Sequence, residues 1–453
     1  MADKTFSLGE VVEGRNSVLF QTSENSVLYE KLANTVHSGT KEELSGLQKR
    51  IEAVEYRPVF ETGSLKASKN DPPSVLIFEV TEQCNLRCDY CINSGDYPRE
   101  RTYSPKKMST DTADKALEEI VPLMKDTSMI SFYGGEPLLN IDIINHIMKQ
   151  AREKFHSKGL MFSMTTNFFN GDRYIKEIVD NGMYVNLSLD GPPEVHDRFR
   201  KTESGNPTYS RIRSNLDKVE EYSPGYVDSH FVMLSTCYDP ADLEKIVRFF
   251  DNEELFLIHV SSVDKKGRPE GTLFPETDHN ELNSEYINRI LDGKEPKTLR
   301  RLFDSDLKAV ALRDDREMPE ELMLHGSCYP GRRRVFVDVN GEYHPCERFG
   351  PRLRIGSVYE GMSNILSERI MDTFSEIRNG LCTDCWAQRI CKPCTQYAKD
   401  PRGEISAEGL SQGCGDRRKQ LIGSLANYAI LLGSNREAAD KYFKSINPLF
   451  ERG

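Results

Sequence analysis

Three cysteines lie close together in the segment TEQCNLRCDYC, at Cys84, Cys88 and Cys91. The apolar run SVLIFEV comes just before them and predicts a buried strand, so the three thiols would share one tight loop at the end of that strand. Three thiolates on such a loop can hold three irons of a four-iron cluster and leave the fourth iron without a protein ligand. That open iron is where we expect chemistry.

A zinc knuckle is the structural alternative for this triplet. Structural zinc sites are closed by four ligands and usually contain CxxC pairs. No histidine and no further cysteine lies near residues 81 to 127. The spacing therefore favours an iron-sulfur cluster.

Seven more cysteines form a second zone toward the C-terminus. Their CxxC spacing suits a zinc ribbon as well as an iron-sulfur site. Cys237 has no other cysteine near it in the sequence, so we expect it to be a buried structural thiol. The seven are Cys328, Cys346, Cys382, Cys385, Cys391, Cys394 and Cys414.

Six short apolar runs alternate with longer amphipathic stretches between the two zones, and this repeated βα pattern predicts a parallel sheet. We expect a partial, six-unit (β/α) barrel of the TIM type with its active site at the C-terminal strand ends. Two of the expected helices run from Ser109 to Lys125 and from Ala241 to Asn252. The apolar runs cover 75–80, 129–133, 160–164, 184–189, 230–235 and 255–260.

The first 70 residues have a different pattern. SVLF and SVLYEKL flank the polar TSEN and predict a hairpin, and KEELSGLQKRIEAV predicts an amphipathic helix. The polar linker KASKNDPPS then closes what we interpret as a small separate module.

Composition limits the partners and the compartment. The 453 residues include 71 acidic and 60 basic ones, so the chain has no overall charge signature for nucleic acid or anionic lipid. No apolar stretch approaches the roughly 20 residues of a membrane span, and the N-terminus lacks a signal segment. We therefore expect a soluble cytoplasmic protein that binds neither nucleic acid nor membrane, with cysteines serving metal or redox chemistry.

The triplet resembles the signature of the radical S-adenosylmethionine (SAM) superfamily, CxxxCxxC with an aromatic residue, here Tyr90, before the last cysteine. The resemblance implies that the amino and carboxylate groups of SAM complete the fourth iron. It also implies that cleavage of SAM yields a 5′-deoxyadenosyl radical, which removes a hydrogen atom from an unactivated carbon.

The resemblance implies further SAM contacts, one group after each strand. The family's GGEP motif holds the SAM ammonium, and the ends of the third and fourth strands bind ribose and carboxylate. An arginine in HDRFRK suits a carboxylate, because its planar fork matches two oxygens. These residues are Gly134, Gly135, Glu136, Pro137, Asn167, Ser188 and Arg200.

The second zone resembles the SPASM domain, the auxiliary-cluster extension of radical SAM enzymes that modify peptides. It departs from that pattern in having two residues, not three, between Cys391 and Cys394. The resemblance implies one cluster on Cys328, Cys346 and Cys394 and another on Cys382, Cys385, Cys391 and Cys414. With the SAM cluster, that makes three [4Fe-4S] clusters.

The first auxiliary cluster is expected to have an open iron, because fully ligated relatives carry a fourth cysteine where this chain has Leu322. Glu347 follows a cluster ligand at the position where sulfatase-maturating relatives carry an aspartate base. It is a candidate catalytic base, with a surface carboxylate as the alternative. The basic run GRRR at 331–334 could meet acidic substrate side chains or form a solvated face.

The whole chain is similar to peptide maturases of this class, and we expect a thioether-forming enzyme like the sactisynthases and ranthipeptide synthases. Its partners would be a ribosomally made precursor peptide, with a leader and a cysteine-containing core, and a reductant such as flavodoxin or ferredoxin. A maturase forming carbon-carbon links or formylglycine is the enzymatic alternative. A non-catalytic iron-sulfur electron carrier is the alternative of another class.

The expected organisation has five parts. The first is a winged-helix-like module that in relatives pairs the leader with a sheet edge. The radical SAM barrel, a connector, the SPASM domain and a helical tail follow it. Their ranges are 1–70, 74–285, 286–325, 326–430 and 431–453.

Overall fold

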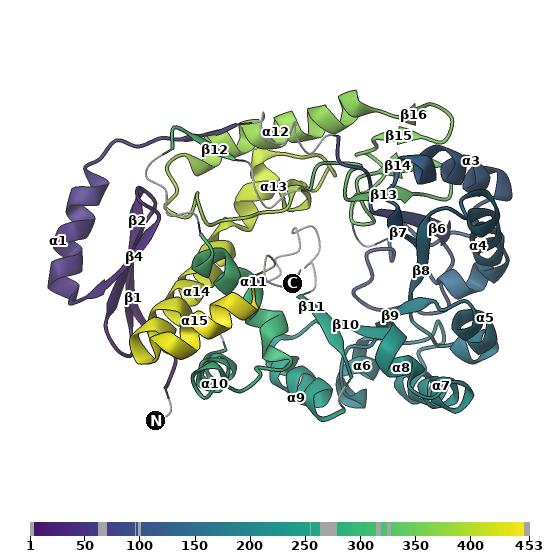
Figure 1. The fold of residues 1–453 in the computed structure, drawn as a ribbon, viewed down its shortest axis with the longest axis horizontal. Helices are drawn as coiled ribbons and strands as arrows, with labels where there is room; N and C mark the ends of the chain where they lie inside the picture. The colour runs from purple at the N-terminus through teal and green to yellow at the C-terminus, as the bar shows by residue number, and fades with distance from the viewer. Residues whose placement is uncertain are drawn as a thin grey trace.

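Six parallel strands form the sheet in the right half of Figure 1, in the spatial order β6-β7-β8-β9-β10-β11. The computed structural model describes residues 4–61, 70–95, 97, 101–253, 255–262, 279–313, 319–323 and 328–447. The strands are β6 (Val75–Thr81), β7 (Thr127–Gly134), β8 (Gly159–Thr166), β9 (Tyr184–Ser188), β10 (Phe231–Cys237) and β11 (Leu257–Ser262).

Each apolar run expected from the sequence overlaps one of these strands, with ends that differ by at most two residues, so the predicted βα repeat and partial barrel are confirmed. β6 is buried along nearly its whole length, as a strand covered on both faces must be. All six strands run parallel, which brings their C-terminal ends to one edge of the sheet.

Helices connect consecutive strands and cover the sheet. The Ser109 side chain accepts a hydrogen bond from the Thr112 amide and caps the first barrel helix at the expected position. The helices of this part are α3 (Thr110–Ile120), α4 (Ile141–Lys154), α5 (Ile175–Asp180), α6 (Pro193–Phe199), α7 (Tyr209–Tyr222), α8 (Tyr226–His230) and α9 (Leu243–Glu253).

The C-terminal cysteine-rich region continues the barrel sheet. β13 (Arg334–Val337) pairs in parallel with β6, and three short antiparallel strands follow it. Within the expected connector 286–325, the helix α11 (Leu299–Ala311) contacts α14 (Cys414–Ser434) and the barrel strand β11, so this region packs into the fold. The remaining elements are β14 (Glu342–His344), β15 (Gly356–Ser357), β16 (Gly361–Met362), α10 (Asn280–Leu291), α11 (Leu299–Ala311), α12 (Asn364–Cys382), α13 (Ala407–Gln412), α14 (Cys414–Ser434) and α15 (Arg436–Ser445).

The N-terminal module is a four-stranded antiparallel meander followed by one helix. The expected hairpin and the expected helix are both present, and Thr40 and Glu43 form a capping box at the helix start. A winged helix is built around several helices, whereas residues 4–61 contain a single one, so the module differs from that expectation. Its elements are β1 (Leu8–Glu13), β2 (Ser17–Thr22), β3 (Ser26–Glu30), β4 (Thr35–Gly39) and α1 (Lys41–Glu52).

This module is packed into the body of the protein. One face of its sheet packs on α1, and the other belongs to the large core that includes the C-terminal helices. Figure 1 shows the purple sheet beside the yellow helices α14 and α15. The Tyr29 ring meets the buried Trp386 ring edge-on, with centroids 5.9 Å apart. The module and the cysteine-rich region therefore share one hydrophobic core.

A short strand extends this contact. β5 (Val59–Glu61) pairs in parallel with β12 (Glu321–Met323), with Phe60 opposite Leu322. The Arg378 guanidinium lies 3.8 Å from the centroid of the Phe60 ring. Leu322, at the position where a fourth cysteine is absent, is buried in the small core around Phe60.

Trp386→Ala should lower the free energy of unfolding by about 3–5 kcal/mol, because it removes a fully buried side chain between two parts of the fold. Tyr359→Ala removes a ring that is 65% exposed and should change stability by less than about 0.5 kcal/mol. Urea denaturation followed by circular dichroism would measure both. Equal midpoints for the two variants would contradict the shared core.

Candidate active site

The cysteine triplet lies on the loop directly after β6. The Cys91 amide donates to the Cys88 carbonyl at 3.0 Å, and the Leu86 amide lies 3.4 Å from the Cys84 sulfur. Burial raises the pKa of the Cys84 thiol, and the Cys88 and Cys91 thiols raise it further. The three cysteines line one cavity of about 780 Å³, so the expected set is together in space.

Two glycines hold this loop in place. The Gly135 amide donates to the Thr81 carbonyl at 2.9 Å, and the Glu136 amide donates to the Gln83 carbonyl at 2.7 Å. A Cβ on Gly134 would lie 2.2 Å from the Thr81 oxygen, and one on Gly135 would lie 2.2 Å from the Gln83 oxygen. Only glycine permits such an approach, so GGEP fixes the backbone just before Cys84.

The Glu136 carboxylate turns toward the end of β8. It accepts hydrogen bonds from the Thr166 hydroxyl at 2.6 Å and from the amides of Asn167 at 2.8 Å and Leu138 at 3.1 Å. Burial raises its pKa to about 7, and these bonds oppose the shift. Pro137, buried beside it, begins a 3₁₀ turn (Pro137–Asn140). The carboxylate thus ties two strand ends together, while the backbone of Gly134 and Gly135 faces the cavity.

Asp190 organises the other side of the site. Its carboxylate accepts hydrogen bonds from Arg200 Nε at 2.8 Å, from the Thr236 amide at 2.9 Å and from the Tyr90 hydroxyl. Arg200 Nη1 then lies 4.0 Å from the Cys88 sulfur. Burial raises the pKa of Cys88 to about 12, and the Arg200 charge lowers it. Arg200 is therefore held at the cysteine loop with its charge toward a thiol.

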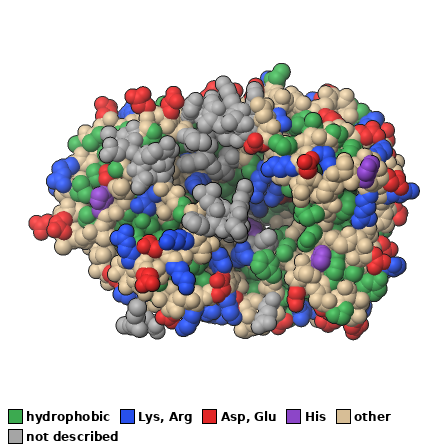
Figure 2. All heavy atoms as spheres, in the orientation of Figure 1, with side chains coloured by type: hydrophobic (Ala, Val, Ile, Leu, Met, Phe, Trp, Pro, Cys, Tyr) green, Lys and Arg blue, Asp and Glu red, His purple; other side chains and the backbone are tan. Residues whose placement is uncertain are grey.

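Asn167 and Ser188 also line the cavity, as expected. The Asn167 side-chain amide donates to Asn85 Oδ1 at 2.8 Å and lies 3.8 Å from the Cys84 sulfur. Figure 2 shows this face of the molecule hollowed at its centre, with Lys and Arg side chains at the edge of the hollow. Arg333 and Arg348 are among the basic residues of the cavity lining.

The second zone contributes three cysteines to the same cavity: Cys328, Cys346 and Cys394. Burial raises the pKa of Cys346 to about 12, with a further increase from Cys394. Burial also raises the pKa of Cys394, and the Cys328 thiol adds to it. Arg333 Nη1 lies 3.8 Å from the Cys328 sulfur. These are the three residues expected to hold the first auxiliary cluster.

Five cysteines line a second cavity of about 450 Å³: Cys382, Cys385, Cys391, Cys414 and Cys394, the last of which also lines the first cavity. Cys382 is the last residue of α12 and Cys414 the first residue of α14. Burial raises the pKa of Cys414 to about 11, and Cys391 and Cys382 raise it further. The four other than Cys394 are the cysteines expected to hold the second auxiliary cluster.

The two cavities adjoin, because His259, Cys394 and Tyr397 line both. No three His, Cys, Asp or Glu side chains within the described ranges converge as the ligands of a single metal ion would. The cysteines instead surround cavities, and three or four thiols around one cavity suit a cluster of several irons, each bound by one thiolate. The residues present therefore fit iron-sulfur clusters.

Glu347 lies beside the first auxiliary set. Its Oε1 accepts a hydrogen bond from Arg334 Nη1 at 2.6 Å, while its Oε2 is buried with no hydrogen-bond partner in the part of the chain that the structure describes. The backbone carbonyls of Glu347 and Phe349 accept hydrogen bonds from Arg101, at 2.8 and 2.6 Å. Arg101 also pairs with the buried Glu79, 3.7 Å away.

Sequence reasoning missed Asp190 and Arg101. Asp190 is the acidic residue of SLDG, two positions after Ser188, and that motif was a usable signal. No local sequence motif marks Arg101, because it lies 246 positions from Glu347, the residue whose carbonyl it contacts. Cys237 is buried and donates to the Asp239 carbonyl at 3.1 Å, as expected of a structural thiol.

Comparisons with known proteins show the family of this chain. The radical SAM superfamily model matches residues 78–250. An uncharacterised protein of Methanocaldococcus jannaschii is 30% identical over 230 residues, which cover 50% of this chain and 74% of that protein. The chain belongs to the radical SAM superfamily. The model of the SPASM iron-sulfur cluster-binding domain matches residues 328–386 of this radical SAM enzyme.

Two further matches cover more of the radical SAM enzyme. The cysteine-type anaerobic sulfatase-maturating enzyme of Clostridium novyi is 24% identical over 346 residues, 72% of this chain and 89% of that enzyme. The solved structure of native anSMEcpe with bound AdoMet superposes with a TM-score of 0.59 at 20% identity, covering 79% of this chain and 99% of that one. The fold is therefore that of a radical SAM enzyme, and its two domains imply SAM and [4Fe-4S] clusters as cofactors.

If each of the three cysteine sets holds one cluster, replacing Cys84, Cys88 and Cys91 with alanine should remove about one third of the iron from anaerobically reconstituted enzyme. SAM cleavage should be abolished, because the iron that binds SAM is lost. Cys237→Ala, which changes a thiol outside all three sets, should leave both quantities unchanged. Iron analysis and chromatography of 5′-deoxyadenosine would measure them. Stoichiometric zinc in place of iron would overturn the cluster assignment.

Proposed function

We propose that this radical SAM enzyme modifies a ribosomally made peptide by joining a cysteine sulfur to a carbon. The observation that supports the proposal most is that Cys84, Cys88 and Cys91 face the same cavity as Cys328, Cys346 and Cys394. A peptide segment in that cavity would have its reacting carbon and its thiol between the two cysteine sets.

The number of cysteines supports a first auxiliary cluster in which one iron has no protein ligand. The three sets use ten of the chain's 11 cysteines, and Cys237 is buried beside Asp239 and Asp242 at the end of β10. Leu322 is an apolar core residue paired with Phe60. Three cysteines then leave one iron for a substrate thiol.

With its cofactors bound, the enzyme would obtain a 5′-deoxyadenosyl radical from SAM and the SAM-binding cluster. The first auxiliary cluster would supply an iron that binds a thiolate and would accept an electron. In the reaction, one hydrogen atom leaves the carbon with deoxyadenosyl, the thiol loses its proton, a C–S bond forms and one electron leaves the peptide. Glu347 is the carboxylate next to the auxiliary set that can take that proton. Arg101 holds the backbone of Glu347 in position.

The peptide partner is supported by the sulfatase-maturating relatives, whose names state that they mature another protein. The N-terminal sheet offers an exposed edge strand, β1, to which a leader could add. A flavodoxin or ferredoxin as reductant and a cytoplasmic location complete the proposal. No helix in the described ranges is long and apolar enough to span a membrane.

The thioether proposal predicts a product that is two hydrogens lighter and has one fewer thiol open to alkylation for each link. Co-expression with candidate cysteine-containing precursor peptides, followed by mass spectrometry with and without iodoacetamide, would measure both. Cysteine-to-serine replacement in the peptide should stop linkage and alter the magnetic resonance signal of the auxiliary cluster. A product lacking two hydrogens whose cysteines all still react would point to a carbon-carbon link.

Formylglycine formation is a second candidate, because one Glu347 oxygen is buried without a partner beside the cavity. In cysteine-type sulfatase maturation, a carboxylate at this position would deprotonate the substrate during its oxidation. The 24% identity to such an enzyme supports this alternative. A formylglycine product would carry an aldehyde that reacts with hydrazides, which a thioether does not.

Glu347→Gln should lower the rate of peptide modification by about 10²–10⁴-fold, the usual contribution of a positioned base. Uncoupled formation of 5′-deoxyadenosine should persist, because the cysteine triplet is untouched. Glu347→Asp should recover part of the rate, whereas Glu404→Gln, at an exposed ion pair, should have no effect. Full activity of Glu347→Gln would remove the residue from the mechanism.

A further inference from the structure

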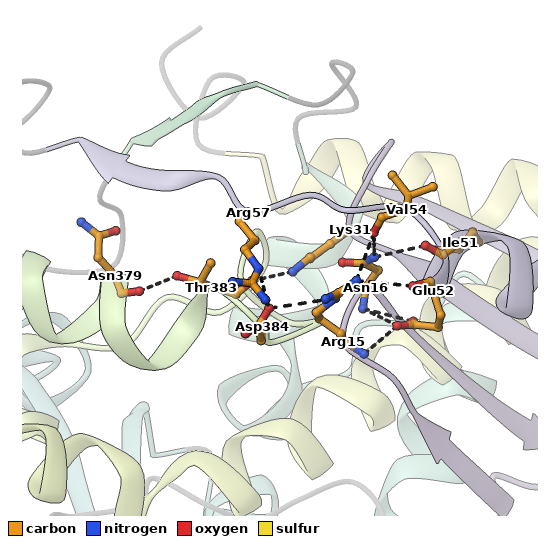
Figure 3. Close-up of polar contacts among 10 residues, drawn as sticks. All are labelled: Arg15, Asn16, Lys31, Ile51, Glu52, Val54, Arg57, Asn379, Thr383 and Asp384. Carbon is orange, nitrogen blue, oxygen red and sulfur yellow. Dashed lines mark hydrogen bonds and ion pairs between the residues drawn. The ribbon is translucent and has the colours of Figure 1, made fainter.

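Lys31 is a fully buried lysine of the N-terminal sheet, just after β3. Its Nζ donates a hydrogen bond of 2.7 Å to the Thr383 carbonyl. Thr383 lies between Cys382 and Cys385, two cysteines of the second auxiliary set. Figure 3 shows the lysine side chain reaching from the N-terminal module to this cysteine loop.

The backbone of Lys31 is tied to both parts of the protein. Its amide donates to the Asn16 carbonyl at 2.8 Å, and its own carbonyl accepts from the buried Arg389 at 3.0 Å. Asn16 is held in turn by bonds to the carbonyls of Ile51 and Val54 at the end of α1. These backbone hydrogen bonds fix the position of Lys31 independently of its side-chain contact.

The Lys31 ammonium group interacts electrostatically with Cys385 and Asp384, which lie on the loop from Cys382 to Cys385. Burial lowers its pKa, whereas Cys385 and Asp384 raise it. The Cys385 thiol lies in the second cavity, and burial raises its own pKa to about 12. A buried positive charge next to a cluster ligand acts through a medium of low dielectric constant, where screening is weak.

A second cation of the same module provides the contrast. Arg57 contacts Asp384 of the same loop at 3.4 Å, but the two side chains are 54% and 55% exposed. An exposed pair of this kind is screened by water and salt. Lys31 and Arg57 therefore bring like charges to one loop, one buried and one solvated (Figure 3).

We propose that the N-terminal sheet is part of the second auxiliary site: Lys31 positions the loop from Cys382 to Cys385, and its charge raises the reduction potential of the cluster that this loop holds. Reduction adds one electron and one negative charge to a cluster, and a buried cation beside it stabilises the reduced state. The proposal rests on the assignment of these cysteines to one cluster and not on the thioether chemistry. Lys31 is a positioning residue, since its contact is with the ligand loop.

Three Lys31 variants separate the charge from the hydrogen bond. Lys31→Gln keeps a donor for the Thr383 carbonyl but removes the charge, Lys31→Met removes both, and Lys31→Arg keeps both. Arg57→Met is the matched control, because it removes an exposed cation from the same loop. Each full-length enzyme would be reconstituted anaerobically, analysed for iron and titrated with dithionite under electron paramagnetic resonance. A parallel set lacking Cys84, Cys88 and Cys91 would show the auxiliary signals alone.

We expect Lys31→Gln to retain its iron and one auxiliary signal to titrate at a more negative potential than in the parent enzyme. Lys31→Met should show the same shift with loss of up to about one third of the iron, the share of one cluster in three. Lys31→Arg and Arg57→Met should match the parent. An unshifted potential in Lys31→Gln would overturn the proposal, whether or not Lys31→Met retains its iron. The redox titration does not depend on the peptide reaction. Failure of the Lys31 proposal can therefore be distinguished from failure of the thioether proposal.

Discussion

The parallel pairing of β13 with β6 is the contact on which both cysteine sets of the main cavity depend. β6 ends in the loop that carries Cys84, and β13 lies between the segment of Cys328 and the segment of Cys346. Four successive backbone pairs, from Arg334 opposite Val75 to Val337 opposite Phe78, set the register. A slip of one residue would turn the β13 side chains to the other face and displace the two segments. The distance between the two proposed reaction centres is thus set by backbone hydrogen bonds rather than by the cysteines themselves.

Much of the barrel could be predicted from the sequence, because its signals are local. β-branched runs of strand length, caps such as Ser109 and glycines at strand ends each act within a few residues. The three cysteine sets could be grouped for a different reason: spacing and family resemblance assign ligands without any knowledge of the loops between them. In the structure each set lies around one cavity, although Cys394 lines both, so the assignment of Cys394 to the first auxiliary set stays a prediction.

What the sequence did not show depends on contacts between distant segments. The N-terminal residues have a hairpin and an amphipathic helix, which suggested a small separate module, but they do not show which distant segment covers the second face of the sheet. Val18, Phe20 and Val27 alternate with residues that face α1, so both faces are apolar. A two-sided apolar sheet needs two covers, and the second one comes from the far end of the chain. The orientation of Glu136 toward β8 was hidden for the same reason, since Thr166 and Asn167 become its neighbours only in the folded sheet.

The contact of Lys31 with Thr383 joins residues 352 positions apart, and it has a consequence for synthesis on the ribosome. At about 5–20 residues per second, the N-terminal sheet would wait roughly 20–70 s for the segment that covers it. During that time its outer face, including Tyr29, is open to other nascent chains and to chaperones. The second auxiliary site, as assigned above, would likewise be incomplete until Cys414 has left the ribosome, so iron would enter it only after nearly the whole chain has been made. On that assignment, chain folding and cluster insertion are coupled at the end of translation.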